Sequence, residues 1–219
     1  MEEQSHALSA AAFARHAGAV DPAGAEPGRI SSRLVYDGRV VHLSVDTVRF
    51  PDGSIGELEI VRHSGAAAVL PVLDPEGTPD PRILLVRQYR YASGGELLEV
   101  PAGRPDFPGE DWEACARREL EEEAALRAAR LVRLGAIYTT PGFTDERIHL
   151  FLAFDVSPGT QALDADEFVE PVVLRLSEAL ARVGAGEIVD AKTICTLHLA
   201  ARRLAGPDLS TRSGQLSSG

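Results

Sequence analysis

The sequence has few of the residues that stabilise small secreted domains or bind polyanions. Only two of its 219 residues are cysteine, Cys115 and Cys195, and their spacing matches no metal site, so we expect a reducing compartment and no disulfide scaffold. Acidic residues outnumber basic ones by 33 to 22, which gives a formal net charge of −11. That balance argues against a surface that holds nucleic acid or anionic lipid. We therefore expect no nucleic-acid partner.

Long hydrophobic runs are also missing. No stretch of about 18 apolar residues occurs, and the chain begins with acidic residues where a signal peptide is basic. These absences predict a cytoplasmic protein with no membrane partner. Lysine is nearly absent too, since Lys192 is the only one, and we interpret this as a compositional bias. The 44% of apolar residues suffice for one packed domain and a modest appendage.

Composition divides the chain into four stretches. Residues 1–28 are rich in Ala, Gly and Pro and residues 206–219 in Ser and Gly, so we expect both to be disordered. Residues 29–64 alternate polar and apolar positions around a Pro-Asp-Gly turn at 51–53, which predicts a small antiparallel β subdomain. Residues 65–205 then form the main domain.

Strands and helices alternate in the main domain. Two continuous apolar runs predict strands that are buried on both faces, and four further strands and three helices follow. The expected strands are 66–73, 83–89, 97–100, 131–139, 148–156 and 171–176, and the expected helices are 112–126, 177–183 and 191–204. This order predicts an α/β fold, a layered sandwich with a mixed sheet.

Three glutamates of the expected helix 112–126 fall on one helical face. Glu119, Glu122 and Glu123 stand at positions i, i+3 and i+4, whereas Glu121 points elsewhere. Like charges at this spacing destabilise a bare helix, so a bound cation explains the pattern better. Oxygen ligands favour Mg²⁺, with Mn²⁺ as the alternative. A solvated acidic face, the other interpretation, would not need the Gly/Pro loop that leads into the helix.

The segment from Gly103 to Leu126 resembles the signature of the Nudix hydrolase family. The positions in register are Glu110, Arg118, Glu119, Leu120, Glu122, Glu123 and Leu126. Two positions depart from it. Six residues separate Gly103 from Glu110 where the family has five, and Ala125 stands where the family has glycine. If the family's left-handed turn is retained, that alanine costs roughly 1 kcal/mol.

The resemblance extends over about residues 33–204 and is strongest to the ADP-ribose pyrophosphatase branch. Four motifs occur in the order that this branch has. They are Val86-Arg87-Gln88-Tyr89-Arg90, Glu99-Val100-Pro101-Ala102-Gly103, Pro141-Gly142-Phe143-Thr144-Asp145-Glu146 and Asp166-Glu167-Phe168-Val169-Glu170. The resemblance implies a Nudix-type α/β/α sandwich with a mixed β-sheet. It also implies a homodimer formed through the N-terminal β subdomain.

The resemblance further implies a metal site and a catalytic base. Glu119, Glu122, Glu123 and the backbone carbonyl of Ala102 are implied as metal ligands, although the longer loop can displace that carbonyl. For Glu122 the alternative to a metal ligand is a supporting contact to the other ligands, and Glu122 is assigned to catalysis as well. Glu167 is implied as the general base or as a residue that completes the metal site when its loop closes. Asp166 and Glu170 compete for that role.

Other residues are implied to hold the substrate or the loop. Arg90 is implied to contact phosphate, with a surface arginine as the alternative, and Glu99 to orient loop or substrate groups. Phe143 and Glu146 are candidates for the sugar side of the pocket. Arg118 and Glu110 are expected to brace the loop against the helix.

The function that the resemblance implies is Mg²⁺-dependent hydrolysis of ADP-ribose to AMP and ribose 5-phosphate. The partner would be a small nucleoside diphosphate sugar. Another nucleoside diphosphate sugar or a dinucleotide, such as GDP-mannose or NADH, is the alternative substrate. A Nudix sensor that binds its ligand without turnover is the alternative from a different class.

Overall fold

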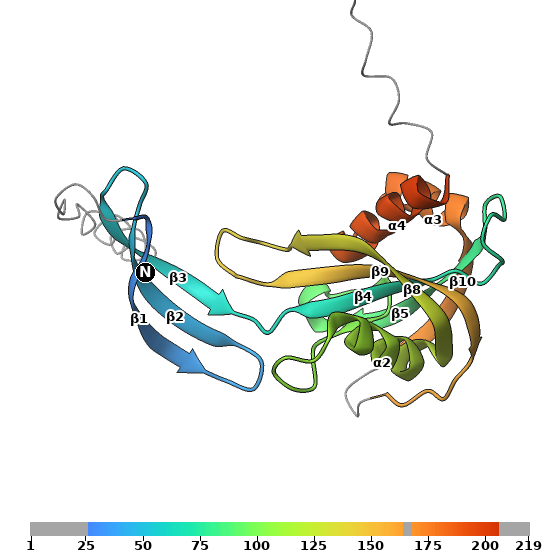
Figure 1. Cartoon of the computed structure of the whole chain (residues 1–219), viewed down its shortest axis with the longest axis horizontal. Coiled ribbons are helices and arrows are strands. Elements are labelled where there is room, and N and C mark those ends of the chain that lie inside the picture. Colours follow the sequence, from blue (N-terminus) through green and yellow to red (C-terminus); the bar gives the residue numbers. More distant parts are fainter. Residues whose placement is uncertain (1–25, 164–167, 206–219) are drawn as a thin grey trace, which may run out of the picture. The chain divides into compact units, whose positions relative to one another are not determined.

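The computed structural model describes residues 26–163 and 168–205, and its contacts divide the chain into two compact units (Figure 1). The first unit comprises the described residues up to His63 together with Thr140–Glu146. The second comprises Ser64–Thr139 and the described residues from Arg147 onward. The predictions of disorder for 1–28 and 206–219 lie outside the described residues, except at 26–28, where Gly28 already belongs to a strand.

The first unit is a three-stranded antiparallel sheet in the order β1-β2-β3, formed by Gly28–Asp37, His42–Arg49 and Ile55–Arg62. The expected turn between β2 and β3 forms because Asp52 accepts a hydrogen bond from the Ser54 amide (3.0 Å). All ten residues of β1 are exposed, so this edge strand lacks the buried alternation by which a strand is recognised in a sequence.

The loop Thr140–Glu146 is attached to β3 of the first unit. The Val61 amide donates a hydrogen bond to the Phe143 carbonyl (2.8 Å), and Asp145 accepts one from the His63 amide (2.8 Å). Arg62 also forms an ion pair with Asp145 at 3.1 Å. Phe143 and Glu146 therefore belong to the unit that carries the N-terminal sheet.

The second unit contains two hydrogen-bonded sheets. A four-stranded sheet has the order β7-β4-β9-β8, with β4 parallel to β9, and a three-stranded antiparallel sheet has the order β10-β5-β6. The strands are β4 (Ala66–Pro71), β5 (Arg82–Arg90), β6 (Gly95–Glu99), β7 (Ala102–Gly103), β8 (Leu126–Tyr138), β9 (Arg147–Pro158) and β10 (Val169–Arg175). A 3₁₀ turn at Tyr91–Ser93 joins β5 to β6.

Strand β4 lies in the middle of the unit, and all six of its residues are buried. Ala66, Ala68 and Leu70 pack in one core with α3 (Leu176–Gly184) and α4 (Ala191–Leu204). Ala67 and Val69, which alternate with them, pack in a second core with α2 (Trp112–Ala124). Helices thus cover both faces, and the predicted α/β/α sandwich is confirmed (Figure 1). No helix within 26–163 and 168–205 is long and apolar enough to span a membrane.

Helix α2 begins where the sequence predicts and ends earlier. Asp111 caps it by accepting hydrogen bonds from the amides of Glu113 (2.9 Å) and Ala114 (3.2 Å). The helix ends at Ala124, whereas we expected it to continue to about Leu126. Ala125 adopts the left-handed conformation, with φ 52° and ψ 37°, and Leu126 already begins β8. The family's left-handed turn is thus retained without its glycine.

Candidate active site

Two of the three glutamates of α2, Glu119 and Glu122, meet at the guanidinium of Arg118, and the third, Glu123, meets the backbone of Ala102. Glu119 and Glu123 are buried, with 7% and 2% of their surface exposed, and Glu122 is partly exposed. Glu121 points away and pairs with Arg127 at 2.6 Å. Burial of two carboxylates on one face of a helix is costly unless cations or donors compensate them, so the groups around this face decide what it can do.

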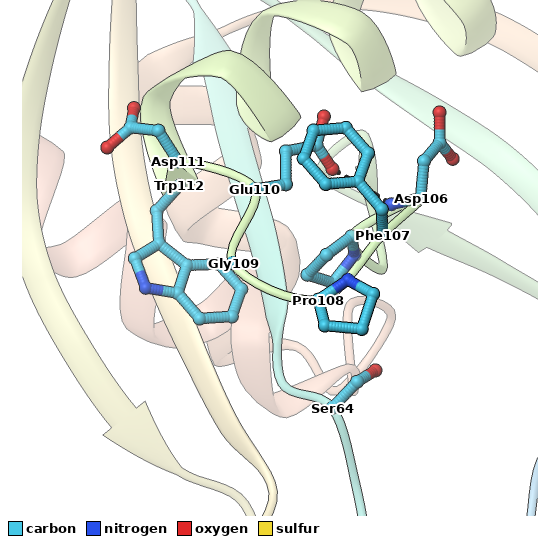
Figure 2. Close-up of a pocket in the computed structure, with 9 residues that line it drawn as sticks. Ser64, Asp106, Phe107, Pro108, Gly109, Glu110, Asp111 and Trp112 are labelled. Atoms are coloured by element: carbon cyan, nitrogen blue, oxygen red, sulfur yellow. Dashed lines mark hydrogen bonds between the residues drawn. The ribbon is translucent and has the colours of Figure 1, made fainter.

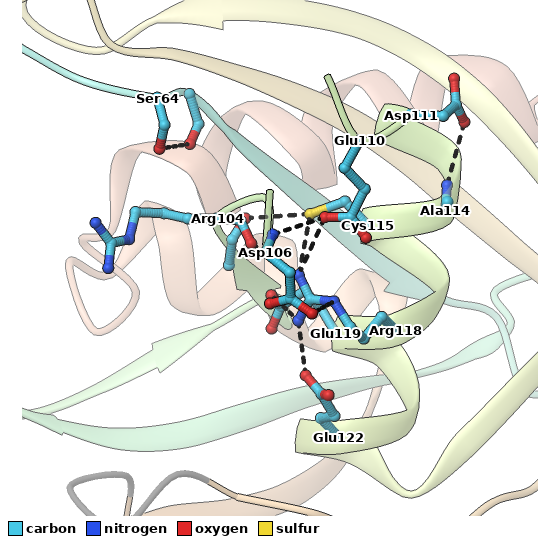
Figure 3. A network of polar contacts seen from close by, with 12 residues as sticks. Ser64, Arg104, Asp106, Glu110, Asp111, Ala114, Cys115, Arg118, Glu119 and Glu122 are labelled. Carbon is cyan, nitrogen blue, oxygen red and sulfur yellow. Dashed lines mark hydrogen bonds and ion pairs between the residues drawn. The ribbon is translucent and has the colours of Figure 1, made fainter. Parts of the chain in front are cut away.

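Arg118 is the cation at the centre of this face. Its Nη1 donates hydrogen bonds of 2.8 Å to Glu119 Oε1 and to Glu122 Oε2, and its Nη2 donates one of 2.7 Å to the carbonyl of Arg104 (Figure 3). It also forms ion pairs with Asp106 at 3.2 Å and Glu110 at 3.6 Å. One guanidinium thus joins α2 to the preceding loop.

Negative charge exceeds positive charge around Arg118. Burial alone would lower the pKa of Arg118, but the charge of Glu119 and the hydrogen bonds to Glu122 and Glu119 raise it above its ordinary value. The arginine is therefore permanently charged, and the four carboxylates that surround it leave this cluster with a net charge of −3. The four are Asp106, Glu110, Glu119 and Glu122.

Strand β7 brings the backbone against the same carboxylates. The Ala102 amide donates a hydrogen bond to Glu123 Oε2 (3.0 Å). A Cβ atom on Gly103 would lie 2.1 Å from Glu119 Oε1, so only glycine leaves room for this carboxylate. Ala102 and Gly103 pair in register with Ala68 and Ala67 of β4. The six residues between Gly103 and Glu110 therefore do not disturb the strand that precedes them.

The donor set on α2 fits a divalent cation. It consists of carboxylate oxygens, which Mg²⁺ and Mn²⁺ prefer, and its negative charge is in excess. In the described residues, no three His, Cys, Asp or Glu side chains are gathered closely enough to hold a metal ion as they stand. The reason is visible in the contacts, because Glu119 and Glu122 are drawn to Arg118 and Glu123 to the Ala102 amide.

A second ionic cluster surrounds Glu99 at the end of β6. Arg90 binds both carboxylate oxygens of Glu99, through Nε (2.9 Å) and Nη2 (2.8 Å), and Lys192 Nζ lies 2.5 Å from Oε2. Glu99 is only 2% exposed. Burial would raise the pKa of Glu99, but the bonds to Arg90 and Lys192 outweigh it and hold the pKa below its usual value. Glu99 is therefore ionised and orients Arg90.

The two predicted residues of this cluster, Arg90 and Glu99, differ in exposure. A third member, Lys192, was not predicted from the sequence. The side chain of Arg90 is 41% exposed and keeps Nη1 outside its two bonds to Glu99, whereas the side chain of Glu99 is only 2% exposed. Lys192 was assigned to compositional bias. The signal that could have identified it is its rarity: one lysine in the whole chain, two residues after the Asp190 that caps α4.

The other residues predicted for the site do not lie on the acidic face of α2 in the second unit. Phe143 and Glu146 lie in the loop of the first unit, where Phe143 is exposed and Glu146 lies 3.5 Å from His63 Nδ1. Glu167 lies outside the described residues, as does Asp166. Glu170 is in β10 and pairs with Arg87 at 3.6 Å.

An open pocket of about 670 Å³ lies beside the loop that precedes α2. It is lined by Ser64 and by residues 105–112, and Figure 2 shows the rings of Phe107, Pro108 and Trp112 along that loop. None of the three glutamates of α2 lines it. Trp112, the first residue of α2, stacks on His149 of β9, with ring centroids 4.2 Å apart. The pocket therefore borders the cluster around Arg118 through Asp106 and Glu110, but the three glutamates of α2 do not line it.

Comparisons with known proteins agree with this geometry. The model of the NUDIX domain family matches residues 62–197. An ADP-ribose pyrophosphatase of Bacillus subtilis is 42% identical over 170 residues, which span 77% of this chain and 89% of that protein. A methanol dehydrogenase activator of Bacillus methanolicus is 40% identical over 175 residues, which span 79% of this chain and 91% of that protein.

A solved structure described as an ADP compounds hydrolase matches with a TM-score of 0.70 and 23% identity. The match covers 84% of this chain and 97% of that one, and at this identity it bears on the fold alone. The family match and the two relatives together show that the chain belongs to the Nudix family. The recognition made from the motifs is thereby confirmed.

Proposed function

We propose that this Nudix protein is a Mg²⁺-dependent pyrophosphatase that hydrolyses ADP-ribose to AMP and ribose 5-phosphate. The observation that carries the proposal is the excess of buried and half-buried carboxylates on α2 next to Gly103. The 42% identity to a protein described as an ADP-ribose pyrophosphatase supports the choice of substrate.

The proposed reaction replaces the bridging P–O bond with a bond from water oxygen to phosphorus. One proton of the water passes to a base, for which Glu167 is the proposed group, and the leaving phosphate departs with the bridging oxygen. Glu119, Glu122, Glu123 and the carbonyl of Ala102 would hold the metal. When bound, Mg²⁺ neutralises charge on the diphosphate oxygens and favours ionisation of water.

Other residues of the chain contact the metal ligands or the substrate in this proposal. Arg118 joins Glu119 and Glu122 to the carbonyl of Arg104 in the preceding loop, and Mg²⁺ would compete with Arg118 for these carboxylates. Arg90 is proposed to contact the diphosphate with the part of its guanidinium that Glu99 does not use. Phe143 and Glu146 are proposed to contact the sugar of the substrate.

We also propose a cytoplasmic homodimer. The exposed apolar side chains of the edge strand β1, Ile30, Leu34, Val35 and Tyr36, support association through the first unit. A dimer would have twice the mass of the chain in light scattering, and substitution of Leu34 and Tyr36 by Ser should reduce it to the monomer.

A substrate panel tests the proposed activity. ADP-ribose, GDP-mannose and NADH are each incubated with Mg²⁺, with Mn²⁺ and with EDTA, and kcat/KM is measured for each. We expect ADP-ribose to rank first, with no turnover in EDTA. If GDP-mannose or NADH ranks first, the substrate assignment is wrong. Saturable binding of ADP-ribose without AMP release would identify a ligand-binding sensor instead.

A further inference from the structure

Lys192 reaches from α4 to the cluster that contains Arg90. Its Nζ lies 2.5 Å from Glu99 Oε2 and 3.1 Å from Asp190 Oδ1, and its side chain is 13% exposed. Glu99 and Lys192 are 93 residues apart in the sequence. The contact therefore connects the end of β6 to the start of α4.

The first turn of α4 is fixed relative to β6 by a second contact. Asp190 caps the helix by accepting hydrogen bonds from the amide (2.9 Å) and hydroxyl (2.6 Å) of Thr193. The same hydroxyl oxygen accepts a hydrogen bond from the Val100 amide (2.9 Å). The backbone next to Glu99 and the residue next to Lys192 are thus tied together, which leaves the ammonium little freedom to move.

The position is an unfavourable one for a cation. The N-terminal end of a helix carries a partial positive charge and favours anions, so a lysine in the first turn is stabilised only by the carboxylates that it meets. A buried ion pair is in itself weak support for stability. A role in the electrostatics of the site accounts better for a lysine placed here.

The type of residue also fits this role. Of the 22 basic residues one is lysine, so 21 are arginine. Both oxygens of Glu99 already accept hydrogen bonds from Arg90. A second planar guanidinium would compete for the same bidentate geometry, whereas a compact ammonium can share Oε2.

The charges of the cluster balance only when Lys192 is present. Arg90 and Lys192 contribute +2, and Glu99 and Asp190 contribute −2. Without the lysine the cluster has a net charge of −1, and Arg90 alone compensates the buried Glu99. Arg90 would then present less positive potential at its exposed edge.

We propose that Lys192 is a positioning residue for anion binding, which shares the charge of Glu99 and so keeps Arg90 available for a phosphate group. This inference rests on the proposed function, in which Arg90 contacts the diphosphate. Lys192 itself does not touch the substrate.

The test compares Lys192→Met with Lys192→Arg and with Arg203→Met, which removes an exposed cation from the last turn of the same helix. KM and kcat for ADP-ribose are measured with Mg²⁺ at several salt concentrations. We expect Lys192→Met to raise KM about tenfold, with kcat changed less than about twofold and with a weaker dependence of KM on salt. Lys192→Arg should recover part of the loss, and Arg203→Met should resemble the unmodified protein.

A double variant separates electrostatics from folding. Lys192→Met with Glu99→Gln restores the neutral balance, so its KM should be lower than that of Lys192→Met alone. A purely structural lysine predicts a KM for the double variant at least as high as for the single one, and this result would overturn the inference. So would a KM for Lys192→Met equal to that of Arg203→Met.

Binding of inorganic pyrophosphate, followed by calorimetry, provides a readout that does not depend on turnover. If the unmodified protein fails to hydrolyse ADP-ribose, the proposed function is wrong, and the inference is still tested by this titration. We expect about tenfold weaker binding in Lys192→Met and none of this loss in Arg203→Met. Absence of binding to the unmodified protein would overturn the inference.

Discussion

The two ionic clusters of the second unit differ in charge balance. Around Arg118 four carboxylates meet one cation, whereas around Glu99 two carboxylates meet two cations. Excess negative charge next to a glycine that leaves room for a carboxylate suits the binding of a cation. A balanced cluster with one exposed arginine suits the binding of an anion. A metal-dependent reaction on a diphosphate needs both.

The clusters also differ in how the chain assembles them. Arg118, Glu119 and Glu122 are adjacent on one helix, so α2 alone brings them together. Arg90, Glu99 and Lys192 come from β5, β6 and α4 and meet only in the folded unit. A shift of α2 should therefore affect the first cluster more than the second, which α2 reaches only through the charge of Glu123.

The largest effect is expected from neutralising the acidic face. Glu119→Gln and Glu123→Gln should each reduce kcat for Mg²⁺-dependent AMP release about 10³-fold, because each removes a charge that would hold the metal. Glu121→Gln is the matched control, since Glu121 lies on the same helix but pairs with Arg127. Equal losses in all three variants, with folding intact by circular dichroism, would contradict a special role for this face.

Removal of the partly exposed Arg90 should weaken substrate binding. Arg90→Ala should raise KM for ADP-ribose about 10- to 100-fold through the loss of charge-assisted hydrogen bonds to phosphate. Arg87→Ala is the control, because Arg87 lies on the same strand, is equally exposed at 41% and pairs only loosely with Glu96 and Glu170. If Arg87→Ala raises KM as much as Arg90→Ala, the cluster around Glu99 is not the anion site.

The sequence predicted the part of the site that depends on local geometry. Helical periodicity was sufficient for the acidic face of α2, and α4 was expected at 191–204, where the structure has Ala191–Leu204. The end of α2 was placed two residues too late, because Leu126 continues the apolar pattern although the chain has already turned at Ala125. Periodicity cannot show a turn that depends on one residue's φ.

Contacts between distant segments could not be predicted in the same way. The bond from Lys192 to Glu99 joins residues 93 positions apart, and no spacing rule links them. The assignment of Thr140–Glu146 to the first unit likewise depends on hydrogen bonds to β3. The role of Glu167 stays a prediction.

The left-handed residue at the end of α2 offers a third test, in which the expected change is a small one in the free energy of unfolding. Ala125→Gly should raise the free energy of unfolding by about 1 kcal/mol, because glycine adopts the left-handed conformation without strain. Ala124→Gly, one residue earlier and helical, should lower it by a similar amount or more. Urea denaturation measures both. Equal destabilisation by the two changes would show that the turn at Ala125 is not strained.

The start of α2 offers a test through pH, with the smallest effect. His149, 6% exposed, stacks on Trp112, and its Nδ1 lies 3.0 Å from Arg133 Nη2. Burial, reinforced by the charges of Arg133 and Arg147, lowers the pKa of His149 below its ordinary value. The unfolded chain therefore binds this proton at a higher pH than the folded protein does. The contribution of neutral His149 to the free energy of unfolding is therefore complete above about pH 6.5 and is lost as the pH falls below that value.

Replacing His149 should remove this part of the pH dependence. In His149→Gln the free energy of unfolding should fall less between pH 7.5 and pH 5 than in the unmodified protein, by about 0.5 kcal/mol. Thermal denaturation at several pH values measures how the free energy of unfolding changes with pH. This change does not depend on the constant free energy that is lost with the stack on Trp112. His198→Gln, on the exposed side of α4, is the control and should keep the original slope. A steeper fall of the free energy of unfolding with decreasing pH in His149→Gln would mean that the folded protein stabilises the charged imidazole. The stack of His149 on Trp112 would then involve a charged ring.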